Sequence, residues 1–447
     1  MITSRLPGFY KLSLDERRRV AADALGVSID ELEVALEGGG LSVASADKTI
    51  ENVIGTYALP LALALNVKVN GRDYLVPMAV EEPSVVAAAS AAARSVRDGG
   101  GFFAVADAPV MIAQIELDQV PEVHEAVRAV MTHERRLREL ADAAVPGLVA
   151  RGGGARHLEM RLLDGSATNA WMVVHVHLDC RDAMGANLAN TVAEALAPEL
   201  ERLTGGRVGL RILSNLCDTR RVRAVCRVPP ASLVMGERTG EEVRDGIVRA
   251  SRFAERDPYR AATHNKGIMN GIDPVVIATG NDWRAVEAGA HAWAARTGHY
   301  SPLATWSVVG AETRDLSGVL APPAQHGWLQ GKIELPIALG IVGGTLRVHG
   351  GAKAALALTG VTSAQELAML ACSVGLASNL AALRALATVG IQEGHMALHA
   401  RSVASAAGAQ ESEVERVAAI IHGRGWVTLD AATQALRELR AETDAAE

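Results

Sequence analysis

One lysine, Lys266, lies in the polar segment of this sequence that offers the most chemistry. The segment 263–273 reads THNKGIMNGID, and Gly280-Asn281-Asp282 follows a few residues later. Lysine is rarely fully buried without a partner, and glycine beside polar groups lets the backbone come close to a ligand. The pattern therefore predicts an active-site ammonium framed by amides and a nearby carboxylate. From these residues alone, a polar turn between two elements is the alternative.

A carboxylate pair, Glu81-Glu82, precedes Pro83-Ser84 at the expected start of a helix that continues to Ser95. Its titratable groups could take part in chemistry. They could equally cap the helix, because carboxylates stabilise the positive end of the helix dipole and proline fits an early helical position. Both interpretations stay open on these residues alone.

The turn 182–187 (DAMGAN) follows an expected strand at 171–178 and opens an expected helix at 185–203. A strand, a glycine and a helix N-terminus form a natural site for a pyrophosphate. An ordinary strand-to-helix turn has the same pattern. The usual dinucleotide fingerprint is missing, since 152–157 (GGGARH) lacks its final glycine and precedes a strand instead of following one. A dinucleotide site here would therefore belong to a fold other than Rossmann.

Two histidine pairs complete the candidates. His175 and His177 point to one face of the 171–178 strand, a spacing that can place two imidazoles on a metal. No further His, Asp or Glu at recognisable metal spacing follows, so we expect a half-exposed sheet face and no metal. His395 and His399 are four residues apart on one helix face. They could be surface histidines, or one of them could act as a general acid on a mobile helical domain.

The elements that must position these residues indicate an α+β fold. Residues 109–219 should form an inserted ferredoxin-like (split βαβ, non-Rossmann) domain within a large mixed helical and sheet domain, 1–108 and 220–375, and residues 376–447 a small helical C-terminal domain. Capping boxes at Ser13 and Ser28 start two helices, and Asn70-Gly71 indicates a hairpin. The elements expected after residue 108 are strand 111–117, helix 121–144, strands 158–163 and 171–178, helix 185–203, strand 207–213, an alternating run at 221–228, a nearly continuous helix at 376–407, one capped by Ser412 and Glu415, and one at 428–442.

Composition limits the function classes. The 447 residues carry a net charge of −7 without a basic block, so we expect no nucleic-acid partner. The most apolar stretches are too short to span a membrane, and the N-terminus does not resemble a signal peptide. The four cysteines lack Cys-x-x-Cys spacing, as is usual for free thiols in a reducing compartment. We therefore expect a soluble cytoplasmic protein with no membrane partner.

Taken together, these segments resemble the 3-hydroxy-3-methylglutaryl-coenzyme A (HMG-CoA) reductase family, and within it the soluble bacterial second class. The resemblance covers nearly the whole chain. The segments that carry it are 5–9 (RLPGF), 51–55 (ENVIG), 81–84 (EEPS), 181–187 (RDAMGAN), 263–273 (THNKGIMNGID), 280–282 (GND) and 394–396 (GHM).

The resemblance implies a four-electron interconversion of HMG-CoA and mevalonate plus coenzyme A, by two nicotinamide hydride transfers through a thiohemiacetal and an aldehyde. It assigns four catalytic residues. Lys266 would stabilise the negative charge on the carbonyl oxygen. Glu82 would exchange the proton of that oxygen, and Asp282 would order the hydrogen bonds between the charged groups. His395, on a C-terminal flap, would protonate the coenzyme A thiolate.

The resemblance also implies the binding residues. Arg260 would bind the substrate carboxylate, since its guanidinium is bidentate, with Asn270, Asn215 and Ser84 as hydrogen-bonding neighbours. The large domain would bind substrate and the ferredoxin-like domain the dinucleotide. The dinucleotide would be held by Asp182, Ala183, Met184, Gly185, Ala186 and Asn187. We expect at least a homodimer with active sites at the subunit interface.

Two departures from the family pattern concern the cofactor and the flap. Members that prefer NAD are expected to carry an acidic residue just before the triple glycine, where this chain has Val145 and the nearest substitute is Asp142. Glu393, two residues before His395, replaces a basic or amide residue. We still expect NAD as the cofactor and mevalonate catabolism as the role. The alternatives from other classes are a non-catalytic acyl-coenzyme A binding protein and a metal hydrolase that uses His175 and His177.

Overall fold

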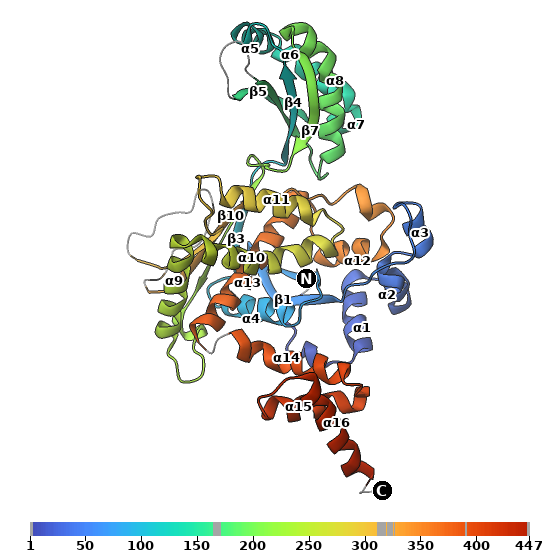
Figure 1. The fold of residues 1–447 in the computed structure, drawn as a ribbon, viewed down its shortest axis with the longest axis vertical. Helices are drawn as coiled ribbons and strands as arrows, with labels where there is room; N and C mark the ends of the chain where they lie inside the picture. Colours follow the sequence, from blue (N-terminus) through green and yellow to red (C-terminus); the bar gives the residue numbers. More distant parts are fainter. Residues whose placement is uncertain are drawn as a thin grey trace.

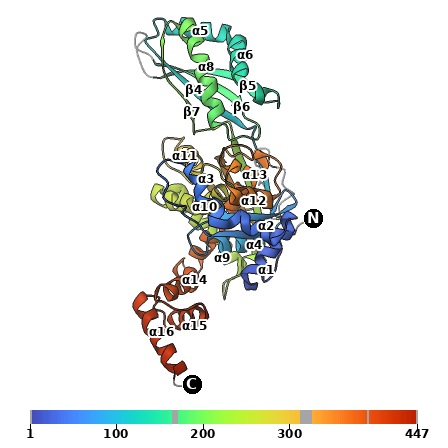
Figure 2. The ribbon, with the colours of Figure 1, turned by 90° about the vertical axis from the view of Figure 1, so that its right-hand side faces the viewer.

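The computed structural model describes residues 3–163, 171–310, 319, 325, 327–388 and 391–444, without the side chains of 391–398, 411 and 442–444. Three parts follow one another along the longest axis of the molecule (Figure 1). A small sheet domain lies at one end, the large domain in the middle and a helical C-terminal part at the other end. The view turned by 90° shows the same order (Figure 2).

The large domain is built around one mixed sheet of six strands. Strands β1 and β3 are parallel, and the other neighbouring pairs are antiparallel. The Asn70-Gly71 hairpin between β1 and β2 is confirmed. Across the sheet the order is β2 (Arg72–Ala79), β1 (Leu61–Val69), β3 (Phe102–Ala106), β8 (Arg221–Val228), β10 (Leu329–Pro336) and β9 (Ala304–Val308).

Helices cover this sheet and share its apolar core. Among them, α10 and α13 pack closely because glycines lie at their crossing. A Cβ added at Gly271 would lie 2.5 Å from the Val374 carbonyl oxygen. By length and composition α13 could cross a membrane, but 78% of its apolar window is buried inside the fold, as in a core helix. The helices are α4 (Val85–Arg97), α9 (Gly240–Arg256), α10 (Pro258–Ala278), α11 (Trp283–Ala294), α12 (Gly350–Thr359) and α13 (Ala364–Ala387), with short 3-10 turns at Pro230–Ser232 and Gly344–Arg347.

An N-terminal helical arm packs beside α12 on the large domain. Both predicted capping boxes are present, since Ser13 and Ser28 each accept a hydrogen bond from the backbone of the glutamate three residues later. The arm comprises a 3-10 turn (Phe9–Lys11), α1 (Leu14–Leu25), α2 (Ile29–Leu36), a 3-10 turn (Glu37–Gly40) and α3 (Val43–Asp47).

The small domain has its own sheet and its own apolar core. The strand order β5-β6-β4-β7 is antiparallel throughout and is that of a split βαβ unit, as predicted. One expectation is corrected: the helix expected over 121–144 is broken at His133. The run 221–228 is a strand of the large sheet, which agrees with the expected start of the second large-domain part at residue 220. The elements are β4 (Val110–Asp118), α5 (Val123–Thr132), α6 (Glu134–Ala144), α7 (Pro146–Val149), β5 (Gly154–Leu163), β6 (Trp171–Asp179), α8 (Ala186–Thr204) and β7 (Arg207–Ser214).

The C-terminal part contains α14 (Ile391–Ala406), α15 (Glu411–Gly423) and α16 (Leu429–Asp444), which pack around a core of their own. The continuous helix expected over 376–407 is wrong, because α13 ends at Ala387. Leu376 lies in the core of the large domain, so the expected boundary at 376 falls inside a large-domain helix. The cap of α15 also lies earlier than expected: the Glu413 side chain accepts a hydrogen bond from Gln410 N at 2.7 Å.

Candidate active site

Lys266 lies in the middle of α10 and not in a turn. The helix starts where Asp257 accepts hydrogen bonds from the first backbone N–H groups and Pro258 occupies the first turn. Lys266 and Asn270 are four residues apart, so they share one face of the helix. Gly271 lies on the side toward α13, where it permits close packing and not approach to a ligand. Gly271 therefore serves the packing of α10 against α13.

The Lys266 ammonium meets Glu82, which lies in the segment between β2 and α4. Nζ of Lys266 is 2.8 Å from Oε2 of Glu82, and Nδ2 of Asn270 is 3.4 Å from the same oxygen. The two charged side chains are 61% and 36% exposed. Residues 184 positions apart in the sequence thus form an ion pair that a substrate can reach.

Ser84 holds an unusual backbone conformation beside this pair. Its φ of 73° lies in the left-handed region, which a residue with a Cβ rarely adopts. Its hydroxyl oxygen is buried and has no hydrogen-bond partner among the described residues. The expected helix start at Glu82 is corrected, since α4 begins at Val85 and neither Glu81 nor Glu82 caps it. A strained residue with an unpaired buried hydroxyl is typical of a ligand-binding position.

A chain of polar side chains behind the lysine was not anticipated from the sequence. Asp273 lies two turns further along α10, and its carboxyl group contacts Glu287 of α11. Glu287 contacts His291, whose Nδ1 is 2.7 Å from the Tyr300 hydroxyl. That hydroxyl accepts a hydrogen bond from Asn265 at 3.0 Å. The chain therefore begins and ends on the helix that carries the lysine.

The charges in this chain are arranged by burial and by mutual contact. Burial, together with the hydrogen bond and negative charge of Glu287, raises the pKa of Asp273 to about 8. The hydrogen bond to Glu287 raises the pKa of His291. The hydrogen bond to His291 lowers the pKa of Glu287. Asp273 therefore favours its protonated form, next to a Glu287–His291 contact in which both groups favour their charged forms.

Asp282 is the N-cap of α11. Its Oδ1 accepts hydrogen bonds from Arg284 N and Ala285 N at 3.1 and 3.2 Å, and Arg284 Nε lies 3.4 Å away. Within the described part of the chain, no hydrogen bond or ion pair joins Asp282 to Lys266 or Glu82. The structure thus gives Asp282 a capping role, while the expected role between the charged groups stays a prediction.

The segment 340–342 lies between two of the predicted site segments. On one side, Asn281 Oδ1 accepts a hydrogen bond from Gly340 N at 2.7 Å. On the other side, Ile341 N donates to Asp182 O at 2.9 Å, and Ala183 forms a bridge with Val342. The turn before α11 and the turn before α8 are therefore brought together across one short segment.

The turn 182–187 is fixed mainly by contacts with the large domain. Asp182 Oδ1 accepts a hydrogen bond from Ala364 N, at the start of α13, at 2.9 Å. The buried guanidinium of Arg220 donates to Met184 O at 2.9 Å and also to Ala183 O. Arg220 was not singled out in the sequence, because a lone arginine after a strand carries no recognisable pattern. Both contacts make this turn a junction between the domains.

The N-terminus of α8 has no side-chain cap. Gly185 precedes the helix with φ 105°, and a Cβ there would lie 2.4 Å from the Cys180 sulfur, so only glycine fits. The first backbone N–H groups of the helix are consequently free of side-chain partners in the described part of the chain. This is the geometry that binds a phosphate group.

Two residues considered for the dinucleotide ribose do not present a free carboxylate. Val145 is buried in the core of the small domain. Asp142 Oδ1 accepts a hydrogen bond from Ala155 N at 2.7 Å and lies against Gly154. The structure thus uses Asp142 to anchor the start of β5.

Among the described side chains, those of the predicted residues Arg260 and Asn215 form no hydrogen bond or ion pair with Lys266 or Glu82. Arg260 is on the first turns of α10, six residues from Lys266 and therefore on a different side of the helix. Asn215 follows β7 and is exposed, with its carbonyl oxygen close to Gly289 of α11. His395 lies on α14, and its side chain, like that of Glu393, falls outside the described residues.

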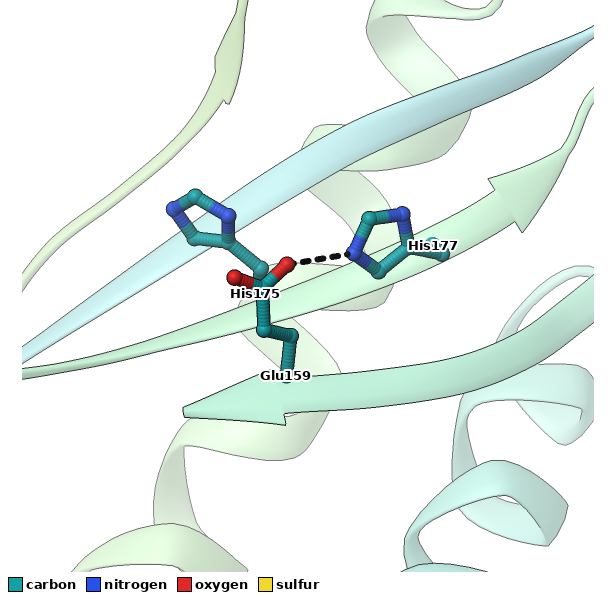
Figure 3. A group of neighbouring side chains, drawn as sticks. All are labelled: Glu159, His175 and His177. Carbon is teal, nitrogen blue, oxygen red and sulfur yellow. Dashed lines mark hydrogen bonds and ion pairs between the residues drawn. The ribbon is translucent and has the colours of Figure 1, made fainter. Parts of the chain in front are cut away.

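The histidine pair on β6 has a third neighbour that the sequence spacing did not indicate. Strand β5 runs beside β6 and places Glu159 directly opposite His175. The ligand atoms of Glu159, His175 and His177 all lie within 4.8 Å of one another (Figure 3). Both histidines are buried, so the expected half-exposed face is wrong. Burial lowers the pKa of both rings, and Glu159 acts in the opposite direction.

A cavity of about 780 Å³ lies between the N-terminal arm, β1, α4 and α12. Its walls are largely apolar, and Val86 and Ala87 from the first turn of α4 are among the lining residues. Arginine side chains also line it, namely Arg5, Arg17, Arg18 and Arg94. The cavity is thus apolar inside with several cations, and two of its lining residues follow the 81–84 segment directly in the sequence.

Comparison with known proteins identifies the family. Residues 13–400 match the family model described as hydroxymethylglutaryl-coenzyme A reductase. The 3-hydroxy-3-methylglutaryl-coenzyme A reductase of Archaeoglobus fulgidus is 47% identical over 439 residues, which cover 98% of this chain and 95% of that protein. The Streptococcus pneumoniae reductase has a similar structure, with a TM-score of 0.78, 42% identity, and coverage of 97% of this chain and 99% of that one. A class II structure from the same organism, bound to NADPH in open conformations, has a TM-score of 0.77 and 43% identity, with coverage of 86% of this chain and 99% of that one. The chain therefore belongs to the hydroxymethylglutaryl-coenzyme A reductase family.

Proposed function

We propose, with this family membership as the premise, that the protein interconverts HMG-CoA and mevalonate plus coenzyme A by two hydride transfers. The observation that carries the proposal is the contact of 2.8 Å between Lys266 Nζ and Glu82 Oε2 on an accessible surface. An acyl-coenzyme A binding protein without activity has no need for a reachable ammonium paired with a carboxylate. That alternative is the second function to test.

Lys266 and Glu82 carry the chemical step in this proposal. Addition of hydride to the thioester carbonyl places negative charge on its oxygen, and an ammonium within hydrogen-bond distance stabilises that charge. Glu82 supplies the proton that converts the oxyanion to a hydroxyl, giving the thiohemiacetal. Loss of the coenzyme A thiol then leaves the aldehyde. A second hydride and a second proton, delivered at the same place, give the alcohol.

A nicotinamide dinucleotide fits the small domain at the uncapped start of α8. When bound, it supplies the hydride for both steps. Gly185 and the free N–H groups of the first turn of α8 would hold its pyrophosphate. Asp182, Ala183 and Met184 would keep this turn next to the 340–342 segment, and so next to the 280–282 turn before α11. Ala186 and Asn187 complete the turn as proposed contacts.

We also propose that the arginine-lined cavity holds part of coenzyme A. Val86 and Ala87, which line the cavity, lie in the first turn of α4, soon after Ser84 in the sequence. An apolar interior suits the pantetheine arm, and the arginines suit the phosphates of the nucleotide part of coenzyme A. The thioester would then lie beside the Lys266–Glu82 pair. Arg260, Asn270, Asn215 and Ser84 are the residues we propose for the 3-hydroxy-3-methylglutaryl group.

The preference for NAD stays a prediction, and the environment of Val145 and Asp142 bears on it. A carboxylate that binds the ribose hydroxyls is also what repels the extra phosphate of NADP. Val145 is buried, and Asp142 is engaged by Ala155 N. We therefore expect NADPH to be accepted as well, at rates within about tenfold of NADH.

An interface between two copies accounts for an exposed apolar segment. Residues 51–60 have no helix or strand, and Ile50, Ile54 and Tyr57 are exposed. Exposed apolar side chains that gather in one place indicate a protein interface. We propose a homodimer formed through this segment. His395, carried by the separate C-terminal helices, would act on the thiolate after those helices close over the site.

The test is a spectrophotometric assay in both directions. Purified protein is given HMG-CoA with NADH or NADPH, or mevalonate and coenzyme A with NAD or NADP. Turnover with two equivalents of nicotinamide per HMG-CoA supports the proposal. Binding of HMG-CoA without turnover by either cofactor would indicate the acyl-coenzyme A binding protein. The ratio of forward to reverse rates bears on the proposed role in mevalonate catabolism.

A further inference from the structure

The histidines on β6 form, together with Glu159 of β5, a cluster that the proposed reaction does not use. We propose that Glu159, His175 and His177 bind one divalent transition-metal ion, with zinc as the best match in chemistry. Two imidazoles and one carboxylate are a common protein ligand set for zinc, leaving a fourth position for water. The cluster is separate from the lysine site, because it lies on the sheet of the small domain and Lys266 lies in the large domain.

The geometry comes from strand register. In the antiparallel pair β5–β6, Glu159 is opposite His175, and His157 is opposite His177. Side chains of opposite residues lie close together, so a ligand from each strand reaches the same point. Figure 3 shows the glutamate carboxylate between the two imidazoles. Nε2 of His177 is 3.2 Å from Oε2 of Glu159, a separation that one ion between them could replace with a small side-chain movement.

The surroundings hold the rings in place. Nε2 of Gln114 donates a hydrogen bond to Nε2 of His175 at 2.8 Å, so the proton of this neutral ring lies on Nδ1, where a metal ion would replace it. His157 stacks on His177 with ring centroids 3.9 Å apart. Hydrogen bonds to the far nitrogen of a ligating histidine usually fix its orientation and tautomer. With an ion on Nδ1 of His175, the Gln114 amide would have to turn so that its oxygen accepts from the Nε2–H group.

Access and charge also fit an ion. The histidines are buried, but the Glu159 side chain is 52% exposed, so the cluster opens to solvent on the carboxylate side. Among neighbouring charges, Arg161 opposes a cation near His175, while Asp218 acts in favour near both histidines. Nδ1 of His177 is buried without a partner among the described residues, so a doubly protonated ring would be costly there. An ion between Nε2 of His177 and Glu159 would replace the proton shared there, and the neutral ring would keep its proton on Nδ1.

The experiment uses the full-length protein, stripped with a chelator and titrated with Zn²⁺ and with Co²⁺. We expect one equivalent of Zn²⁺ to be retained after gel filtration, and Co²⁺ to give visible d–d absorption without a thiolate charge-transfer band. Glu159→Gln should weaken binding at least tenfold, because it removes the charged ligand but keeps size and exposure. His175→Ala should abolish binding.

Matched controls are the exposed Glu125→Gln and His124→Ala on α5 of the same domain, which should bind metal like the parent protein. Absence of a retained equivalent in the parent protein overturns the proposal. So does equal binding by Glu159→Gln and the parent, or a thiolate band that assigns the ion to the cysteines. If His175→Ala does not fold, the exposed Glu159→Gln variant decides alone. Activity is not needed for any of these readouts.

Discussion

The Lys266–Glu82 pair in the large domain and the Glu159–His175–His177 cluster in the small domain are built in opposite ways. The pair joins a helix to a segment 184 residues earlier in the sequence, and both side chains are partly exposed. The cluster joins two neighbouring strands by register, and its histidines are buried. The first arrangement leaves its charges free to meet a substrate. The second holds its nitrogen atoms in fixed places.

The difference also lies in what supports each group. Behind the lysine, the chain Asp273, Glu287, His291 and Tyr300 connects α10 to α11. Around the cluster each ring has one such neighbour: Gln114 contacts His175, and His157 stacks on His177. A site that changes charge during a reaction needs a polar network to hold it, whereas a site that binds an ion needs fixed donors. The following variants test this contrast.

The largest effect is expected from Lys266→Ala. Removing the ammonium that faces the developing oxyanion should lower kcat for thioester reduction by about 10³ or more. Dinucleotide binding, measured by fluorescence of the bound reduced cofactor, should change less than about threefold, because the α8 site is in another domain. Metal binding at the small-domain cluster should not change.

Glu159→Gln is the matched control for this experiment, with the opposite pattern: normal turnover by metal-free protein and weakened metal binding. Loss of dinucleotide binding in Lys266→Ala would show that the lysine holds the fold and not the transition state. Loss of turnover in metal-free Glu159→Gln would show that the reaction also depends on the small-domain cluster, and it would contradict the contrast between the two sites.

A second, smaller effect concerns the dependence of each site on a second subunit. Ile54→Arg places a charge in the exposed apolar segment and should separate the proposed dimer, lowering activity by about 10² through incomplete active sites. Analytical ultracentrifugation gives the mass, and metal titration should be unaffected.

Val34→Arg, at another exposed apolar position, on α2, is the control and should remain dimeric and active. A fully active Ile54→Arg monomer would contradict the proposal that the lysine site needs a partner while the small-domain cluster does not.

The two sites also differ in how far the sequence could predict them. The split βαβ order of the small domain followed from alternating patterns and turn residues, and the structure has it. The contact between Lys266 and Glu82 was expected only through family resemblance, since no local pattern relates a helix to a distant segment. Glu159 was missed because its nearness to His175 depends on strand register, which residue spacing along one strand does not contain. Asp273 stood at the end of the polar segment, but its partner Glu287 could be found only once α10 and α11 were packed together.

A third effect, of about tenfold, is expected at the junction that places the small domain. Asp182→Ala removes the acceptor of the 2.9 Å hydrogen bond from Ala364 N and leaves a partly buried N–H without a partner. The KM for the dinucleotide should rise about tenfold with kcat within about twofold, because the turn loses its position and not the catalytic groups.

Asp182→Asn keeps an acceptor oxygen and should restore most of the affinity, and Asp47→Ala, an exposed aspartate on α3, should have no effect. Equal damage in Asp182→Asn and Asp182→Ala would instead assign the carboxylate charge to direct contact with the cofactor.

The smallest effect is a pH dependence that belongs to the large-domain site alone. Asp273 has a pKa raised to about 8 by burial and by Glu287, so its contribution to stability is complete below its ordinary pKa. That contribution is lost progressively as pH rises from the ordinary pKa of an aspartate to about 8. Asp273→Asn cannot ionise, so its free energy of unfolding relative to the parent should rise between pH 6 and pH 9 by roughly 2–3 kcal/mol, measured as an increase in its melting temperature relative to the parent. Asp23→Asn, an exposed aspartate on α1, should show no such trend. A flat difference for Asp273→Asn across this range would mean that Asp273 is ionised at neutral pH. The chain behind the lysine would then carry one more negative charge than described above, and burial would not set the protonation of the large-domain site.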